Sequence, residues 1–138
     1  MAKASAVIEV PVSAEQVWQL VGGFNSLPDW LPFIVKSEPS EGGRVRHLQT
    51  ADGGVVVERL QSFDNVARTY SYSISESPFP VSEYLATLKV EGLTASSAKV
   101  TWSGVFIPVA GVTDAAVEEL FSGVYSGGLE ALRGNFPG

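Results

Sequence analysis

An arginine and a glutamate stand on the apolar faces of two neighbouring predicted strands. In VRHLQTADGGVVVERL (45–60), two strand-like segments flank a glycine-rich turn. Alternate side chains of a strand share a face, so Arg46 falls with Leu48, and Glu58 falls with Val56. A buried charge without a partner costs several kcal/mol, so such residues are usually paired, exposed or functional.

This pair could carry proton chemistry. A carboxylate in a partly dry pocket has a raised pKa and can move protons, and a guanidinium can orient a substrate and stabilise negative charge on oxygen. The alternative is a structural ion pair inside a filled core. A hairpin with a short loop at 51–53 places Arg46 opposite Glu58, where opposite charges are mildly stabilising. The sequence leaves both interpretations open.

The composition argues against several other classes of protein. With 138 residues, 45% hydrophobic and 17% charged, the chain is expected to form one ordered domain over 1–138. A net charge of −6 with scattered basic residues argues against nucleic acid and anionic membranes as partners. There is no cysteine for thiol chemistry, and the one histidine, His47, lies on the predicted wet face. We therefore expect no metal.

The chain also lacks the features of membrane insertion. No basic segment followed by a long apolar run opens it, and no stretch approaches the roughly 20 apolar residues that span a bilayer. We expect a cytoplasmic protein with no membrane partner. The sequence does not decide between a monomer and a homodimer, although exposed strand edges could support the latter.

Strands that alternate apolar and polar residues dominate the middle of the chain. A first strand is predicted over 3–10 and a second over 33–38, the latter ended by Pro39. Five more follow, separated by short turns that favour antiparallel pairing. They are predicted over 44–50, 54–63, 68–76, 81–91 and 97–107.

Helices are predicted near both ends of the chain. After the first strand, VSAEQVWQLVGG carries a capping-box spacing and an apolar face, and SLPDWLPF allows one further turn. A long helix begins at Thr113 or Asp114. Its apolar stripe consists of Val117, Leu120, Phe121, Val124, Gly128 and Leu132. We therefore predict an α+β fold: a curved seven-stranded antiparallel sheet around a long C-terminal helix, with two short helices after the first strand.

Two features indicate space between the long helix and the sheet. Gly123, Gly127 and Gly128 lie inside the helix, where they either leave room for a ligand or permit close packing. The second feature is an inner sheet face rich in aromatic residues: Tyr72, Tyr84, Trp102 and Phe106. Such residues are more often plain core. However, buried hydroxyls and an indole N–H need partners, which favours a cavity with polar groups.

The order of elements resembles the helix-grip fold of the START/Bet v 1-like (SRPBCC) superfamily, which includes polyketide cyclase/dehydrase-like proteins. Several motifs resemble one branch more closely, the lachrymatory-factor-synthase-like proteins. They are AEQVWQLVGGFNSLPDWLP (14–32), GRVRHL (43–48), VVERLQSFD (56–64), RTYSYSI (68–74), YLATLKV (84–90) and VTWSGVFIPVAG (100–111). The turn TADGG is shorter here than the loop that connects these strands in that branch, so we expect a different pocket mouth.

The resemblance implies a set of site residues. An arginine of the VR motif and a glutamate of the E-(K/R)-L motif are the essential pair of that branch, and two tyrosines stand nearby. It therefore implies Arg46, Glu58, Tyr72 and Tyr84 as catalytic residues, with no cofactor. We expect the ligand to contact six more residues: Trp102, Phe106, Leu48, Val56, Leu120 and Val124.

Three functional hypotheses follow. The first is an enzyme that isomerises, cyclises or dehydrates a small apolar molecule in an internal pocket, with Glu58 carrying the proton and Arg46 orienting the substrate. The second is a non-catalytic binding or carrier protein for a lipid or polyketide-like ligand, in which Arg46 anchors the ligand. The third is the structural ion pair. A cone-shaped barrel of the steroid-isomerase type is set aside, because those chains usually begin with their long helix.

Overall fold

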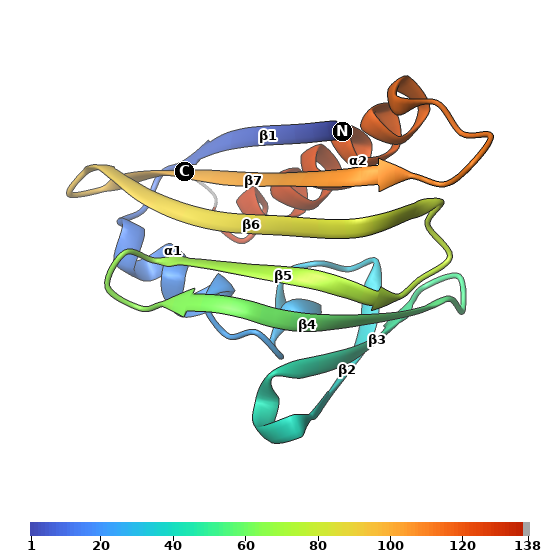
Figure 1. Ribbon diagram of the computed structural model, residues 1–138. Helices are drawn as coiled ribbons and strands as arrows, with labels where there is room; N and C mark the ends of the chain where they lie inside the picture. The colour runs from blue at the N-terminus through green and yellow to red at the C-terminus, as the bar shows by residue number, and fades with distance from the viewer. Residues whose placement is uncertain (137–138) are drawn as a thin grey trace.

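A curved antiparallel sheet wraps around a long helix in the computed structural model, which describes residues 1–136 (Figure 1). The strands follow the order β1-β7-β6-β5-β4-β3-β2, and every neighbouring pair is antiparallel. Their bounds are β1 Ala2–Val10, β2 Ile34–Ser40, β3 Val45–Thr50, β4 Val55–Asp64, β5 Thr69–Glu76, β6 Val81–Thr94 and β7 Ser97–Pro108. The predicted seven-stranded helix-grip architecture is confirmed.

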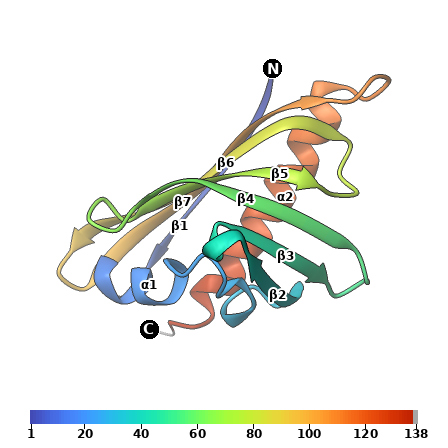
Figure 2. The ribbon, with the colours of Figure 1, turned by 60° about the horizontal axis from the view of Figure 1, so that its bottom comes forward.

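Helices cover the concave side of this sheet. Their bounds are α1 Ala14–Val21 and α2 Asp114–Arg133, and single 3-10 turns lie at η1 Leu27–Asp29 and η2 Glu41–Gly43. Figure 2 shows α1, η1 and α2 on the same side of the sheet. The α2 helix lies against β1 and β7. Two short helices are predicted after β1. The first is α1, and the second, predicted as a single turn, is the 3-10 turn η1.

The long helix begins where its capping residue predicts. The Thr113 hydroxyl accepts a hydrogen bond from the Ala116 N–H at 3.1 Å, which satisfies one of the free donors of the first turn. The buried stripe differs in part from the prediction. It passes through Tyr125 and Leu129, whereas Leu120 is 38% exposed.

The second strand is longer than predicted. It continues through Pro39 to Ser40, with Pro39 opposite Arg46 in the register. Proline cannot donate a hydrogen bond to a neighbouring strand, but β2 is the edge of the sheet. Strand β2 has no neighbouring strand on its outer side, so a residue without an N–H is tolerated there.

The glycines of α2 serve different purposes. A Cβ at Gly128 would lie 2.5 Å from Cζ3 of Trp102, so glycine is required there for close packing of the helix on the sheet. A Cβ at Gly123 or Gly127 would have no atom within 4 Å. Close packing thus explains one of the three glycines and not the other two. Among the described residues, no helix is long and apolar enough to cross a bilayer.

Candidate functional site

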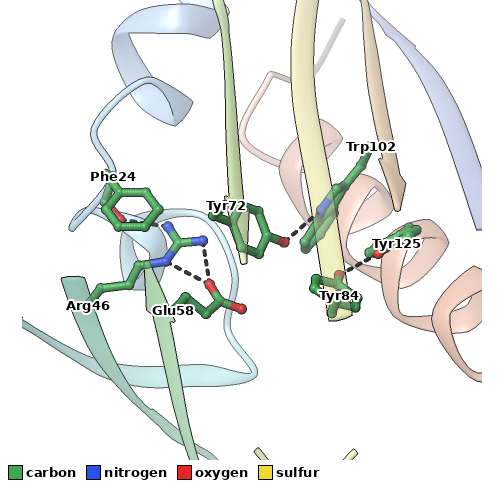
Figure 3. A network of polar contacts seen from close by, with 7 residues as sticks. All are labelled: Phe24, Arg46, Glu58, Tyr72, Tyr84, Trp102 and Tyr125. Atoms are coloured by element: carbon green, nitrogen blue, oxygen red, sulfur yellow. Dashed lines mark hydrogen bonds and ion pairs between the residues drawn. The ribbon is translucent and has the colours of Figure 1, made fainter. Parts of the chain in front are cut away.

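Arg46 and Glu58 face each other across the β3–β4 pair, as strand parity predicts. Both are buried, with 1% and 7% of their surface exposed. Arg46 Nε and Nη2 both contact Glu58 Oε1, at 2.8 and 2.7 Å (Figure 3). Arg46 Nη1 donates to the Phe24 carbonyl oxygen at 2.6 Å. The second carboxylate oxygen of Glu58 points away from the guanidinium and has no bond to it.

Aromatic rings enclose the guanidinium of Arg46. Its central carbon lies 4.0 Å from the centre of the Phe24 ring, 4.9 Å from that of Tyr72 and 5.9 Å from that of Tyr70. Such contacts stabilise a desolvated cation. Arg46 is thereby almost completely removed from solvent.

Burial shifts the ionisation of the pair. It raises the pKa of Glu58, and the attraction of Arg46 offsets only part of that rise. Burial lowers the pKa of Arg46, but the negative charge of Glu58 outweighs this, so the net pKa of the guanidinium is raised. Arg46 therefore stays charged, while Glu58 moves toward the range in which a carboxyl group can both take up and release a proton.

Tyr72 presents a hydroxyl whose donor role is fixed by its neighbour. Trp102 Nε1 donates to the Tyr72 hydroxyl oxygen at 3.0 Å. An indole N–H can only donate, so the proton of Tyr72 remains for another acceptor. Burial raises the pKa of Tyr72 well above its ordinary value of 10.0, so this hydroxyl stays protonated.

Tyr84 forms a second hydroxyl contact, to Tyr125 of α2 (Figure 3). Burial also raises the pKa of both hydroxyls. Either oxygen can be the donor in this bond. The Tyr125 hydroxyl occupies the place that a side chain at position 104 would fill, so Gly104 is required for the contact.

A cavity of about 210 Å³ lies between the sheet, α2 and the segment around η1. Eight of the ten predicted site residues line it: Glu58, Tyr72, Tyr84, Trp102, Leu48, Val56, Leu120 and Val124. Its remaining polar side chain, Thr50, is engaged in the adjacent turn, where its hydroxyl accepts from the Gly54 N–H at 2.8 Å. Among the residues that the structure describes, the second oxygen of Glu58 and the hydroxyl proton of Tyr72 have no partner, whereas the Tyr84 hydroxyl is bonded to Tyr125.

Two predicted site residues do not line the cavity. Arg46 stands behind Glu58, so it does not contact the space in which a substrate would be oriented. Phe106 is fully buried, with its ring centre 5.8 Å from that of Tyr84 and 4.7 Å from that of Phe121. It packs behind the cavity wall, and its role as a ligand contact stays a prediction.

Two residues of the network carry no signal that was read from the sequence: Tyr125 and Phe24. Tyr125 lies one helical turn after Phe121, a spacing that would have placed it on the inner face of α2. Phe24 contributes a carbonyl oxygen and a ring from the segment after α1, and no pattern of residue types marks that role. Within the range 1–136, the structure holds no cluster of three or more His, Asp or Glu residues that could bind a metal ion.

The comparisons with known proteins agree with this fold. A family model described as polyketide cyclase / dehydrase and lipid transport matches residues 1–136. The solved structure of XoxI from Bacillus cereus is 51% identical in sequence, with 99% of this chain and 96% of that chain covered and a TM-score of 0.95. No match was found among the curated proteins.

Two further solved structures share the fold. The di-domain ARO/CYC BexL of the BE-7585A biosynthetic pathway is 25% identical, with 98% of this chain and 46% of that chain covered and a TM-score of 0.86. The Zhui aromatase/cyclase from Streptomyces sp. R1128 is 18% identical, with 96% and 92% covered and a TM-score of 0.78, which shows the fold alone. From the family match and the 51% identical structure, we conclude that this chain belongs to the polyketide cyclase/dehydrase and lipid transport family.

Proposed function

We propose that the protein binds a small apolar molecule bearing a carbonyl or hydroxyl group and moves a proton on it, in an isomerisation, cyclisation or dehydration. One observation carries the proposal. Glu58 is held through one oxygen by Arg46, while it lines an otherwise apolar cavity and its second oxygen points away from the guanidinium. A carboxylate fixed in this way, with a raised pKa, is suited to general acid–base catalysis.

The residues around the cavity have separate roles in this proposal. Glu58 takes up a proton from a carbon next to the carbonyl group, and the bonding electrons move onto the carbonyl oxygen. Tyr72 donates its free proton as a hydrogen bond to that oxygen and stabilises the negative charge that develops there. Glu58 then returns the proton to another carbon or to a leaving hydroxyl group. Arg46 is a positioning residue, since it does not line the cavity and contacts two residues that do, Glu58 and Tyr72.

A carrier function is the second candidate. It is favoured by the apolar lining of the cavity and by the family description, which includes lipid transport as well as cyclase and dehydrase activity. A carrier would use the same hydroxyls for recognition and would release its ligand unchanged. The two functions therefore differ in chemistry and not in the place of binding.

Binding can be tested with 2-tetralone, a small aromatic ketone, by isothermal titration calorimetry. We expect the wild type to bind it, and Tyr72→Phe to weaken binding about fivefold, since one net hydrogen bond is worth about 1 kcal/mol. Glu41→Gln, which alters an exposed ion pair with Arg59, serves as the control and should leave binding unchanged. Equal binding by the wild type and Tyr72→Phe would contradict the proposed site.

A further inference from the structure

An apolar groove runs along the outside of α2, next to the cavity. It encloses about 560 Å³ between the helix and the segment 31–33. No charged residue lines it. On the helix side, its floor includes Gly123 and Gly127, and its opposite wall is formed by Leu31, Pro32 and Phe33. We call this space the tail groove.

The tail groove adjoins the cavity. The same four side chains line both spaces: Leu31, Phe33, Leu120 and Val124. Two of them are large apolar residues that are left open to solvent, since Phe33 is 48% and Leu120 38% exposed. A ligand that projects beyond the cavity on this side would therefore lie directly in the groove.

Packing within the protein does not explain the glycines at positions 123 and 127. Glycine inside a helix is less favourable than alanine, and a Cβ at Gly123 or Gly127 would meet no atom within 4 Å. Gly128, by contrast, is required by its contact with Trp102. The two open glycines keep the groove deep at a cost in helix propensity, although no side chain of the protein fills the space.

We propose that the tail groove binds the hydrocarbon tail of the same ligand whose polar head lies in the cavity. This inference rests on the function proposed above. The three residues that could recognise an oxygen-bearing head, Glu58, Tyr72 and Tyr84, all line the cavity, so the head belongs there. The groove offers only apolar contacts and backbone, so it suits a chain without charge. The ligand is thus an elongated amphipathic molecule, longer than the cavity of about 210 Å³ can hold.

The test uses a series of 4-alkylphenols, from 4-ethylphenol to 4-hexylphenol, measured by calorimetry. Each methylene that enters an apolar site should strengthen binding by up to about fourfold. The variant Gly123→Leu/Gly127→Leu fills the groove. It should bind 4-ethylphenol like the wild type but lose the gain from the longer chains. Both sites have open space, so the variant is expected to fold.

Ser126→Leu is the matched control, because it adds a leucine at an exposed position of α2 outside the groove. It should keep the full gain with chain length. Tail binding in the groove is contradicted if the gain in affinity with chain length persists in Gly123→Leu/Gly127→Leu. It is also contradicted if the wild type binds 4-ethylphenol but shows no such gain. Both results leave the proposed binding in the cavity intact. If the wild type does not bind 4-ethylphenol, both proposals are overturned.

A second copy of the chain is the competing occupant of the groove. Light scattering of the wild type should give a monomer whose mass does not change with protein concentration. A dimer that Gly123→Leu/Gly127→Leu dissociates would assign the groove to a protein interface and overturn the inference.

Discussion

The two carboxylate oxygens of Glu58 are not equivalent. Oε1 accepts from two nitrogens of Arg46, and the other oxygen has no bond to the guanidinium. Arg46 in turn is satisfied by Glu58, by the Phe24 carbonyl and by aromatic faces. This arrangement fixes the orientation of the carboxylate without requiring Arg46 to contact a substrate.

The pair is expected to show strong energetic coupling. Arg46→Met leaves the Glu58 carboxylate buried without a partner and should lower the free energy of unfolding by about 3–5 kcal/mol. Arg46→Met/Glu58→Leu removes both charges and should recover most of that loss. Urea denaturation measures both values.

Arg59→Met is the control for this cycle, because it breaks the exposed ion pair with Glu41, in which Arg59 Nη2 lies 2.8 Å from the carboxylate. An exposed pair of this kind is worth about 0–1 kcal/mol. If the double variant were as unstable as Arg46→Met alone, the loss would not come from an unpaired charge.

The raised pKa of Glu58 predicts a pH dependence of stability. The folded state binds this proton more tightly than the unfolded state, in which the pKa is near the ordinary value of 4.5. The stabilisation is therefore complete below about pH 4.5 and is lost as the pH rises through the folded-state pKa. Thermal denaturation of the wild type and Glu58→Gln should show the difference in stability shifting against the wild type as the pH rises above 4.5. A difference that stays constant with pH would contradict the raised pKa.

Residue types predicted the main pair but not its surroundings. Strand parity placed Arg46 and Glu58 on the inner face, and the structure confirms their direct opposition. Strand parity could not show that Arg46 is buried behind Glu58. That position depends on Phe24, which is remote in sequence and contacts Arg46 partly through its backbone carbonyl. Tyr125 was missed although its helical spacing was available.

Glycine has different roles on the two faces of α2. Gly128 lets the helix approach Trp102, and Gly123 and Gly127 leave its other side open. The sequence could not separate these roles, since a glycine in a helix has the same signature whether it permits contact or leaves space. Only the position of each residue relative to the sheet decides.

Alanine substitutions at the glycines of α2 should therefore change the free energy of unfolding in opposite directions. Gly123→Ala and Gly127→Ala should each raise the free energy of unfolding by up to about 1 kcal/mol, because alanine is the better helix former and no neighbour is displaced. Gly128→Ala should lower it by about 1–3 kcal/mol, because the methyl group overlaps the Trp102 ring. Chemical denaturation checks all three. Stabilisation by Gly128→Ala would contradict the close packing of α2 on the sheet.

Element boundaries were largely predictable from alternation and turn chemistry. The seven strands and the long helix all fall where the pattern predicts them, to within a few residues. The end of β2 was misplaced, because a proline stops a central strand but not an edge strand. The position of a strand within the sheet is a tertiary property that the local sequence does not carry.

For the molecule as a whole, the curved sheet and α2 enclose more space than their side chains fill. The resulting cavity holds a carboxylate and two hydroxyls in apolar surroundings, and burial shifts the pKa of each upward. The fold thereby places a carboxylate with a raised pKa in a mostly apolar cavity. Length, composition and element order predicted this architecture, but the size of the cavity depends on how the side chains pack.

Proton transfer by Glu58 can be followed by deuterium exchange. In D₂O, the hydrogens next to the carbonyl group of 2-tetralone exchange as the ketone enolises, and NMR follows their loss. We predict that the wild type accelerates this exchange above the buffer rate by at least about 100-fold, a typical gain from one general base. Glu58→Gln should remove the acceleration while Glu41→Gln retains it. Exchange at the buffer rate by a wild-type protein that binds 2-tetralone, or equal acceleration by Glu58→Gln, would contradict the account.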